Sequence, residues 1–241
     1  GTQGERVERV RAIAKAIGAQ LFEALAAQHR IDGTQDAEVV QDYLMTCVDN
    51  AALLAKTDLV TDMVGEFPEL QGIMGMYYAQ LDGENPTVAA AIEGHYHPRF
   101  AGDSLPTTLV AQAVALADKL ETLVGIYGIG LIPTGDKDPF GLRRAALGVL
   151  RILMETPLPL DLGKLVEVAK EALTHQGVHL EELDEPLLAF LFDRLRGLLR
   201  DAGYAQEVIE AVLAQRPTRI DLIPLKLDAV RSFLNLPEAL A

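Results

Sequence analysis

The amino-acid sequence predicts an all-α fold. Apolar residues recur at the spacing of one helical face along nearly the whole chain, and no stretch of convincing length alternates apolar and polar residues as a half-buried strand does. Alanine and leucine, which favour helix, are abundant. The chain has 241 residues, of which 49% are hydrophobic, so it is long enough for one large domain or two small ones.

The periodicity locates the helices approximately. Candidate helices cover residues 5–28, 37–64, 68–81, 86–95, 107–127, 139–155, 162–175, 186–201, 205–214 and 223–234. Asn85–Pro86 and Asp138–Pro139 each place a capping side chain before a proline at the first helical position. The helix at 107–127 is apolar or small on both faces, which predicts a central position.

The proline- and glycine-containing stretch at 154–163 is the expected seam between two parts. We expect a helical core at 1–155 and a smaller helical extension at 156–241. Residue 1 is glycine, a helix follows almost at once, and the chain stops at "LPEALA", which reads as the start of another helix. These ends predict a piece of a longer polypeptide with both neighbours missing.

Charge and cysteine content narrow the classes of partner and compartment. The net charge is −14, which argues against a broad nucleic-acid surface, because phosphate binding needs local positive charge. Residues 32–69 carry a net charge of −8, whereas residues 119–151 carry +2, so an anion is best tolerated there. The single cysteine, Cys47, excludes an internal disulfide and suits the cytoplasm, and no apolar run is long enough to span a membrane.

Few residues of this sequence suggest a catalytic or metal-binding site. Asp118 lies on an otherwise apolar face of the predicted central helix, so it needs a cation, a metal or helix-end amides as a partner, and a salt bridge is the commonest of these. His95 and His97 are two residues apart, a spacing that does not put both on one helical face. A metal pair is possible, but a single hydrogen-bonded histidine is more common.

A glycine- and proline-rich loop leads into a helix with several arginines. Arg144 and Arg151 are seven residues apart on one face, and Gly148 between them leaves room for another backbone. Arg143 is expected to point inward to a carboxylate. Either the arginines contact an anion, or all three are ties to buried acidic groups.

Three long stretches together resemble a known family. They are "KTDLVTDMVGEFPELQGIMGMYYA" (56–79), "AIEGHYHPRFAGDSLPTT" (91–108) and "ALADKLETLVGIYGIGLIPTGDKDPFGLRRAALGVLRIL" (115–153). They closely resemble the β subunit of bacterial glycyl-tRNA synthetase, the form built of separate α and β chains. The similarity runs from about Glu5 to the end of the chain.

This resemblance implies a multi-helix bundle of the HD phosphohydrolase type. HD enzymes hold a metal with a histidine, a His-Asp doublet and a later aspartate. The doublet position reads Lys56-Thr57-Asp58, no His-Asp pair occurs anywhere in the chain, and the later aspartate matches Asp118. We therefore expect degenerate HD-like positions at Asp58, His95 and Asp118, with no metal and no catalytic residue.

The resemblance also implies a role in attaching glycine to tRNA. The expected function is a non-catalytic domain of this aminoacyl-tRNA synthetase that engages glycine tRNA, assembles with the α subunit, or both. No cofactor is expected here, because the family uses ATP and magnesium on the α subunit. The candidate tRNA contacts are Arg144, Arg151, Arg99, Lys119 and Lys137.

Two alternatives remain open at this point. One is a metal-dependent phosphohydrolase with an atypical site built from Asp58, His95, His97 and Asp118. The other is a purely structural connector in which the arginines are internal ties.

Overall fold

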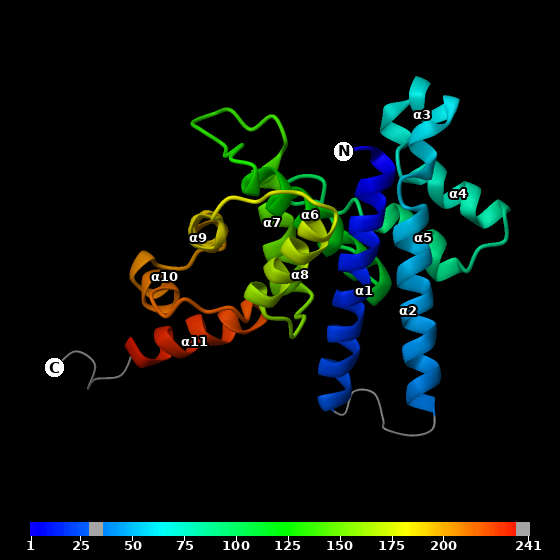
Figure 1. The fold of residues 1–241 in the computed structure, drawn as a ribbon. Coiled ribbons are helices and arrows are strands. Elements are labelled where there is room, and N and C mark those ends of the chain that lie inside the picture. The colour runs from blue at the N-terminus through cyan, green and yellow to red at the C-terminus, as the bar shows by residue number, and fades with distance from the viewer. Residues whose placement is uncertain (29–35, 235–241) are drawn as a thin grey trace.

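The computed structural model describes residues 1–28 and 36–234, and over these residues it contains helices and no β-strand (Figure 1). The predicted all-α class is confirmed, whereas the relation to HD domains stays a prediction. The terminal "LPEALA" stretch, at 236–241, lies outside the described residues. No helix among those described is both long and apolar enough to cross a membrane.

The α-helices and the 3-10 turns (η) follow one another along the chain. They are α1 (Gln3–Ala27), α2 (Asp36–Leu54), η1 (Thr57–Val60), α3 (Asp62–Glu66), η2 (Pro68–Leu70), α4 (Ile73–Leu81), α5 (Pro86–Gly94), α6 (Leu109–Gly128), α7 (Leu142–Glu155), α8 (Leu162–His175), α9 (Asp184–Asp201), α10 (Gln206–Leu213), η3 (Ile220–Leu222) and α11 (Ile223–Leu234).

Helix α6 is the centre of the fold. It contacts α1, α2, α5, α7 and α8. Leu116, Leu120 and Leu123 on this helix have no exposed surface. In Figure 1, α1 and α2 run side by side at one flank, whereas α9, α10 and α11 lie at the other. A helix enclosed on so many sides must be apolar around its circumference, as the sequence predicts.

The hydrophobic core continues past the expected seam. One cluster of buried side chains includes Leu153 of α7, Leu165 of α8 and Leu227 of α11. Helix α7 packs against α9, and α6 packs against α8. The division into 1–155 and 156–241 stays a prediction, and across it the two parts share apolar contacts.

The helix predicted at 37–64 ends early, at Leu54, because one local and two long-range hydrogen bonds compete with its continuation. The Thr57 hydroxyl donates to the Leu54 carbonyl at 2.8 Å, which offers the backbone an alternative to a further helical turn. The Asp58 carboxylate accepts hydrogen bonds from the amides of Gly72 (2.7 Å) and Gly75 (3.1 Å). These long-range bonds favour a 3-10 turn where periodicity alone predicts a continuing helix.

Helix α7 begins at Leu142, three residues later than the predicted start. The N-cap residue is Gly141 rather than the predicted Asp138, although the Asp138 carboxylate still accepts from the amides of Leu142 (2.8 Å) and Arg143 (2.9 Å). Gly141 intervenes with φ +67°, a left-handed conformation that glycine adopts without strain. Asn85, in contrast, caps α5 directly before Pro86, as predicted.

Substitution of Leu120 by alanine tests the central position of α6. Leu120→Ala should lower the free energy of unfolding by about 2–5 kcal/mol, because it leaves a cavity in a fully enclosed layer. Urea denaturation measures the change. Leu81→Ala is the control, since Leu81 is 83% exposed and its truncation should change stability by less than about 0.5 kcal/mol. Equal effects of the two substitutions would contradict a core centred on α6.

Candidate functional site

A cluster of charged and polar groups, enclosed except at Arg6, whose side chain is 32% exposed, surrounds Asp118 on α6. One carboxylate oxygen accepts from Lys56 Nζ at 3.1 Å, and the other accepts from Arg6 Nη2 at 3.0 Å. Lys56 Nζ also lies 2.9 Å from His95 Nε2. His95 Nδ1 lies 2.7 Å from the Ile92 carbonyl oxygen, so Nδ1 carries the ring proton and Nε2 accepts from the lysine. We call Arg6, Lys56, His95 and Asp118 the buried ion cluster.

The protonation states in the buried ion cluster follow from burial and charge. Burial opposes ionisation of Asp118, but the neighbouring charges, Lys56 foremost, hold the pKa of its carboxyl well below the usual value. Burial and the adjacent Lys56 ammonium lower the pKa of His95 well below its usual value, so the ring is neutral. The Lys56 ammonium also lies 4.0 Å from the centre of the Tyr96 ring, in cation–π contact. The carboxylate of Asp118 is therefore neutralised from within the fold, as the sequence predicts.

The side chains at the expected HD-like positions are not arranged to bind a transition metal. The position between His95 Nε2 and Asp118 Oδ2 is taken by the ammonium of Lys56. Asp58, the other expected HD-like position, is buried and binds the Gly72 and Gly75 amides instead. Over residues 1–28 and 36–234, no three His, Cys, Asp or Glu side chains are grouped so that they can hold a metal ion.

The second histidine of the pair belongs to a separate network. His97 Nε2 lies 2.7 Å from the Glu93 carboxylate, and its Nδ1 lies 3.0 Å from the Asp103 carboxylate. Arg99 donates to the same Glu93 at 2.9 Å. The structure thus gives His95 and His97 different partners. Arg99, a candidate tRNA contact, is about one-third exposed and engaged with a carboxylate.

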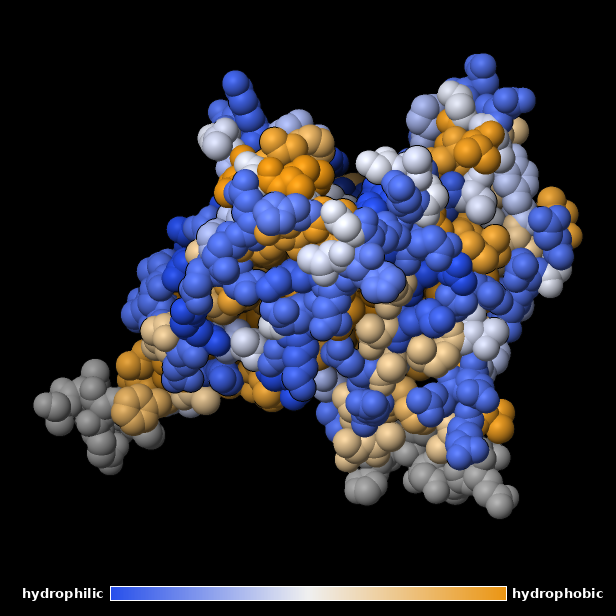
Figure 2. Space-filling view, in the orientation of Figure 1, coloured by the Kyte–Doolittle hydropathy of each residue, from blue (hydrophilic) through white to orange (hydrophobic). Residues whose placement is uncertain are grey.

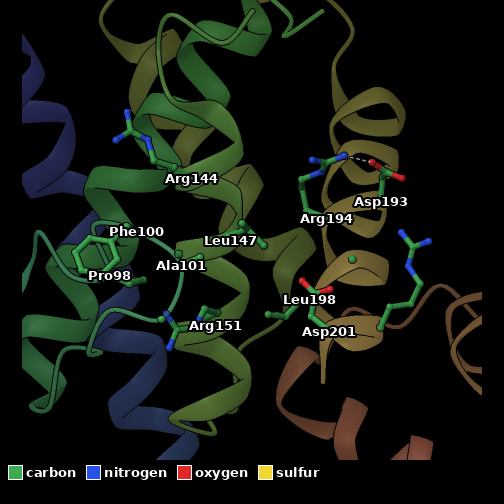
Figure 3. Close-up of a pocket in the computed structure, with 14 residues that line it drawn as sticks. Pro98, Phe100, Ala101, Arg144, Leu147, Arg151, Asp193, Arg194, Leu198 and Asp201 are labelled. Carbon is green, nitrogen blue, oxygen red and sulfur yellow. Dashed lines mark hydrogen bonds and ion pairs between the residues drawn. The ribbon is translucent and has the colours of Figure 1, made fainter. Parts of the chain in front are cut away.

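A groove lies beside this network, and we call it the arginine groove. Its floor is α7, one wall is the 98–102 loop, and the other wall is α9 (Figure 3). It has a volume of about 510 Å³. Its lining residues are Pro98, Phe100, Ala101, Gly102, Arg144, Leu147, Gly148, Arg151, Asp193, Arg194, Gly197, Leu198, Arg200 and Asp201.

The four arginines of the groove differ in how they are engaged. Arg151 is 14% exposed at its side chain, pairs with Glu155 at 2.8 Å and donates to the Asp103 carbonyl at 3.0 Å. Arg194 pairs with the adjacent Asp193. Internal partners therefore engage both guanidinium groups, although Arg194 Nε is buried and makes no hydrogen bond within the described residues.

Arg144 and Arg200 are the other two arginines. Both are exposed, and neither makes an ion pair or side-chain hydrogen bond to any residue within the described ranges. They come from α7 and α9, the floor and one wall of the groove, and in Figure 3 the Arg144 guanidinium extends away from the α9 wall. Such a pair of free cations is suited to an anion, and guanidinium groups match phosphate geometry.

The remaining predicted contacts lie elsewhere. Lys119 is only 8% exposed, and its ammonium donates to the carbonyls of His95 (3.1 Å) and His97 (3.0 Å). Burial lowers the pKa of Lys119 to about 8. Lys137 is exposed in the α6–α7 loop, where its amide bonds to the Thr134 carbonyl at 2.9 Å. Neither ammonium lines the groove.

Two details of α7 differ from the sequence-based expectation. A Cβ on Gly148 would lie 2.6 Å from Lys119 Cε, so this glycine makes room for the lysine stem rather than for a passing backbone. Arg143 donates to the Gly135 carbonyl, not to an internal carboxylate, because its helix starts late and leaves the side chain beside the loop.

Sequence reasoning missed the α9 wall and Phe100. A usable signal is present in "DRLRGLLRD", where Arg194, Gly197 and Arg200 recur every three residues and so lie along one face of a helix. The signal does not say which other helix that face meets. The contact between α7 and α9 supplies this information.

The buried ion cluster makes a testable prediction about stability. Asp118→Asn should lower the free energy of unfolding at pH 7 by about 3–5 kcal/mol, because Lys56 loses its anionic partner and Arg6 keeps only Glu121. The folded-state pKa of Asp118 is depressed, so its contribution is present above the unfolded value near 4. The difference between the two proteins should shrink as the pH falls below about 4.

Urea titrations between pH 7 and pH 3 measure this difference. Asp42→Asn, at an exposed position on α2, is the control and should change stability little at any pH. A constant Asp118→Asn deficit across the acid range would show that the carboxylate charge is not what stabilises the fold.

Comparison with known proteins identifies the family. Residues 1–214 match the family model described as "Glycyl-tRNA synthetase beta subunit". The chain is 62% identical to the glycine--tRNA ligase beta subunit of Acidovorax sp. (strain JS42), with 99% of this chain and 33% of that protein covered. It is 59% identical to the corresponding protein of Aromatoleum aromaticum, with 99% and 32% covered, and 55% identical to that of Thiobacillus denitrificans, with 100% and 32% covered. The chain thus spans about a third of the length of these relatives, and it belongs to the glycyl-tRNA synthetase β-subunit family.

Proposed function

We propose that this chain is a non-catalytic helical domain of a glycine–tRNA ligase β subunit, and that it engages tRNA through the arginine groove. The observation that carries the proposal is a pair of guanidinium groups, Arg144 and Arg200, that have no ion-pair partner among the described residues and lie at one cavity of a strongly acidic chain. The whole enzyme attaches glycine to tRNA, with ATP and magnesium used on the α subunit.

The buried ion cluster supports the non-catalytic part of the proposal. A general base or metal ligand must reach its substrate, but His95 is fully buried and hydrogen-bonded at both ring nitrogens. Asp118 already has two cationic partners. These contacts argue against the alternative phosphohydrolase, since binding a substrate at Asp118 requires breaking its ion pairs with both Arg6 and Lys56.

The charge distribution supports a local contact. A net charge of −14 gives little long-range attraction for tRNA, so binding depends on a few well-placed cations. Arg151 and Arg194 have internal partners, and Lys119 is buried. Arg144 and Arg200 are therefore the two groove side chains best able to reach phosphate.

A separate observation supports a role in subunit assembly. Ile129, Leu131, Ile132 and Phe140 in the α6–α7 loop are each 44–47% exposed. Figure 2 shows apolar side chains gathered around this loop. An exposed apolar patch of this kind is typical of a protein interface, so we propose the loop as the contact for the α subunit or for another part of the β chain.

The double substitution Arg144→Ala plus Arg200→Ala tests tRNA engagement in the intact enzyme. It should raise the Michaelis constant for tRNA and leave tRNA-independent glycyl-adenylate formation unchanged. Removing one arginine–phosphate interaction should reduce the salt slope of tRNA binding by about one unit. Steady-state charging and binding titrations at several salt concentrations measure these effects.

Lys15→Ala plus Arg231→Ala is the charge-matched control, because both side chains are exposed and lie outside the groove. If the groove variant charges tRNA normally at every salt concentration, or if the control weakens binding equally, the tRNA surface lies elsewhere.

A further inference from the structure

We infer that the arginine groove receives a single unstacked nucleotide of the bound tRNA, with its base against Phe100 and its phosphates within reach of Arg144 and Arg200. This inference rests on the proposed function and specifies which part of the RNA enters the groove. Three independent features of the groove support it: its size, its exposed aromatic wall and a glycine on α9.

The size of the groove suits one nucleotide. Its volume of about 510 Å³ lies within the range of about 300–1,000 Å³ that is usual for small-molecule sites. It is closed below by α7 and flanked by the 98–102 loop and α9 (Figure 3). A double helix does not fit between such walls, whereas a base turned out of its stack does.

The wall at Phe100 has the chemistry of a base-stacking platform. Phe100 is 62% exposed, which is unfavourable for a large ring unless something covers it. Leu147 and Leu198 add half-buried apolar surface below and across from it. Proteins that read unpaired RNA stack splayed bases on aromatic rings and hold the adjoining phosphates with cations. The groove combines both kinds of group.

Gly197 on α9 indicates that the space is kept open. A Cβ at this position would meet no atom within 4 Å, and the backbone is helical, so the fold itself does not require glycine. Glycine inside a helix costs about 1 kcal/mol relative to alanine. Gly148 across the groove differs, because Lys119 occupies its side-chain space. An occupant of the groove explains the glycine that the fold leaves unexplained.

The charges of the groove favour an anionic occupant that also carries neutral hydrogen-bonding groups over a neutral one. Arg144 and Arg200 have no carboxylate partner in the described part of the chain, and both are among the residues that line the groove. Asp201 on the same wall is exposed and offers an acceptor for a ribose hydroxyl or a base amino group. A nucleotide complements both signs of charge.

Two uncharged substitutions in the intact enzyme test the inference. Phe100→Leu removes the stacking ring, and Gly197→Leu fills the groove from α9. Each should weaken tRNA binding about 5- to 150-fold, the range expected when one stacked base is no longer held. The salt slope should stay at the parent value, because no cation is removed. Phe100→Tyr should bind as the parent does.

Controls separate binding from folding and from other exposed rings. Gly197→Leu should melt at or above the parent temperature, because leucine favours helix and its Cβ meets open space. Phe140→Leu alters an exposed phenylalanine outside the groove and should leave tRNA binding unchanged.

The outcomes distinguish this inference from the proposed function. If Arg144→Ala plus Arg200→Ala lowers the salt slope while Phe100→Leu and Gly197→Leu bind normally, tRNA touches the rim and no base enters. If none of these variants changes binding, both proposals fail. Phe100→Leu and Gly197→Leu could instead reduce co-purification of the α subunit, with tRNA binding falling only as far as the α subunit is lost. In that case the groove binds protein, and the inference is overturned.

Discussion

The carboxylate of Asp118 imposes the constraint on which the rest of the structure depends. It lies on the central helix α6, where an unpaired charge is costly, so cations must come to it from other elements. Arg6 arrives from α1 and Lys56 from the end of α2, and the Lys56 ammonium also binds His95 at the end of α5. One buried charge thereby ties three helices to the central one.

The next residue on α6 extends this arrangement to the groove. Lys119 donates to the carbonyls of His95 and His97 and so holds the backbone that leads into the 98–102 loop. Its stem passes over Gly148 on α7. Lys119 is therefore a positioning residue for the wall that carries Phe100, although its own ammonium is too buried to meet RNA. The buried ion cluster and the arginine groove are linked through two adjacent residues of one helix.

Much of the fold is predictable from the sequence because helix formation is largely local. Apolar spacing and the Asn85 cap predict elements whose ends agree closely with the structure. The prediction fails where distant partners compete, as at Leu54, where Asp58 binds the amides of Gly72 and Gly75 instead of continuing a helix.

The candidate site is less predictable, for the same reason. Arg144, Arg151 and Lys119 are equivalent in the sequence, since each is a cation in a net-positive stretch. The structure separates them because Arg151 has Glu155 and the Asp103 carbonyl as partners, Lys119 has two carbonyls, and Arg144 has no partner in the described residues. Arg200 joins Arg144 only through the packing of α9 on α7, a long-range contact that no local spacing encodes.

An acidic surface and a small basic groove together favour selective over general RNA binding. A chain with a net charge of −14 repels phosphates over most of its surface, so non-specific affinity is low. On the proposed function, affinity for tRNA comes from contacts that depend on shape, such as a base against Phe100 in a cavity of limited volume. His95 and Asp118 are both engaged with Lys56, so the proposed binding surface is the groove and not this ion cluster.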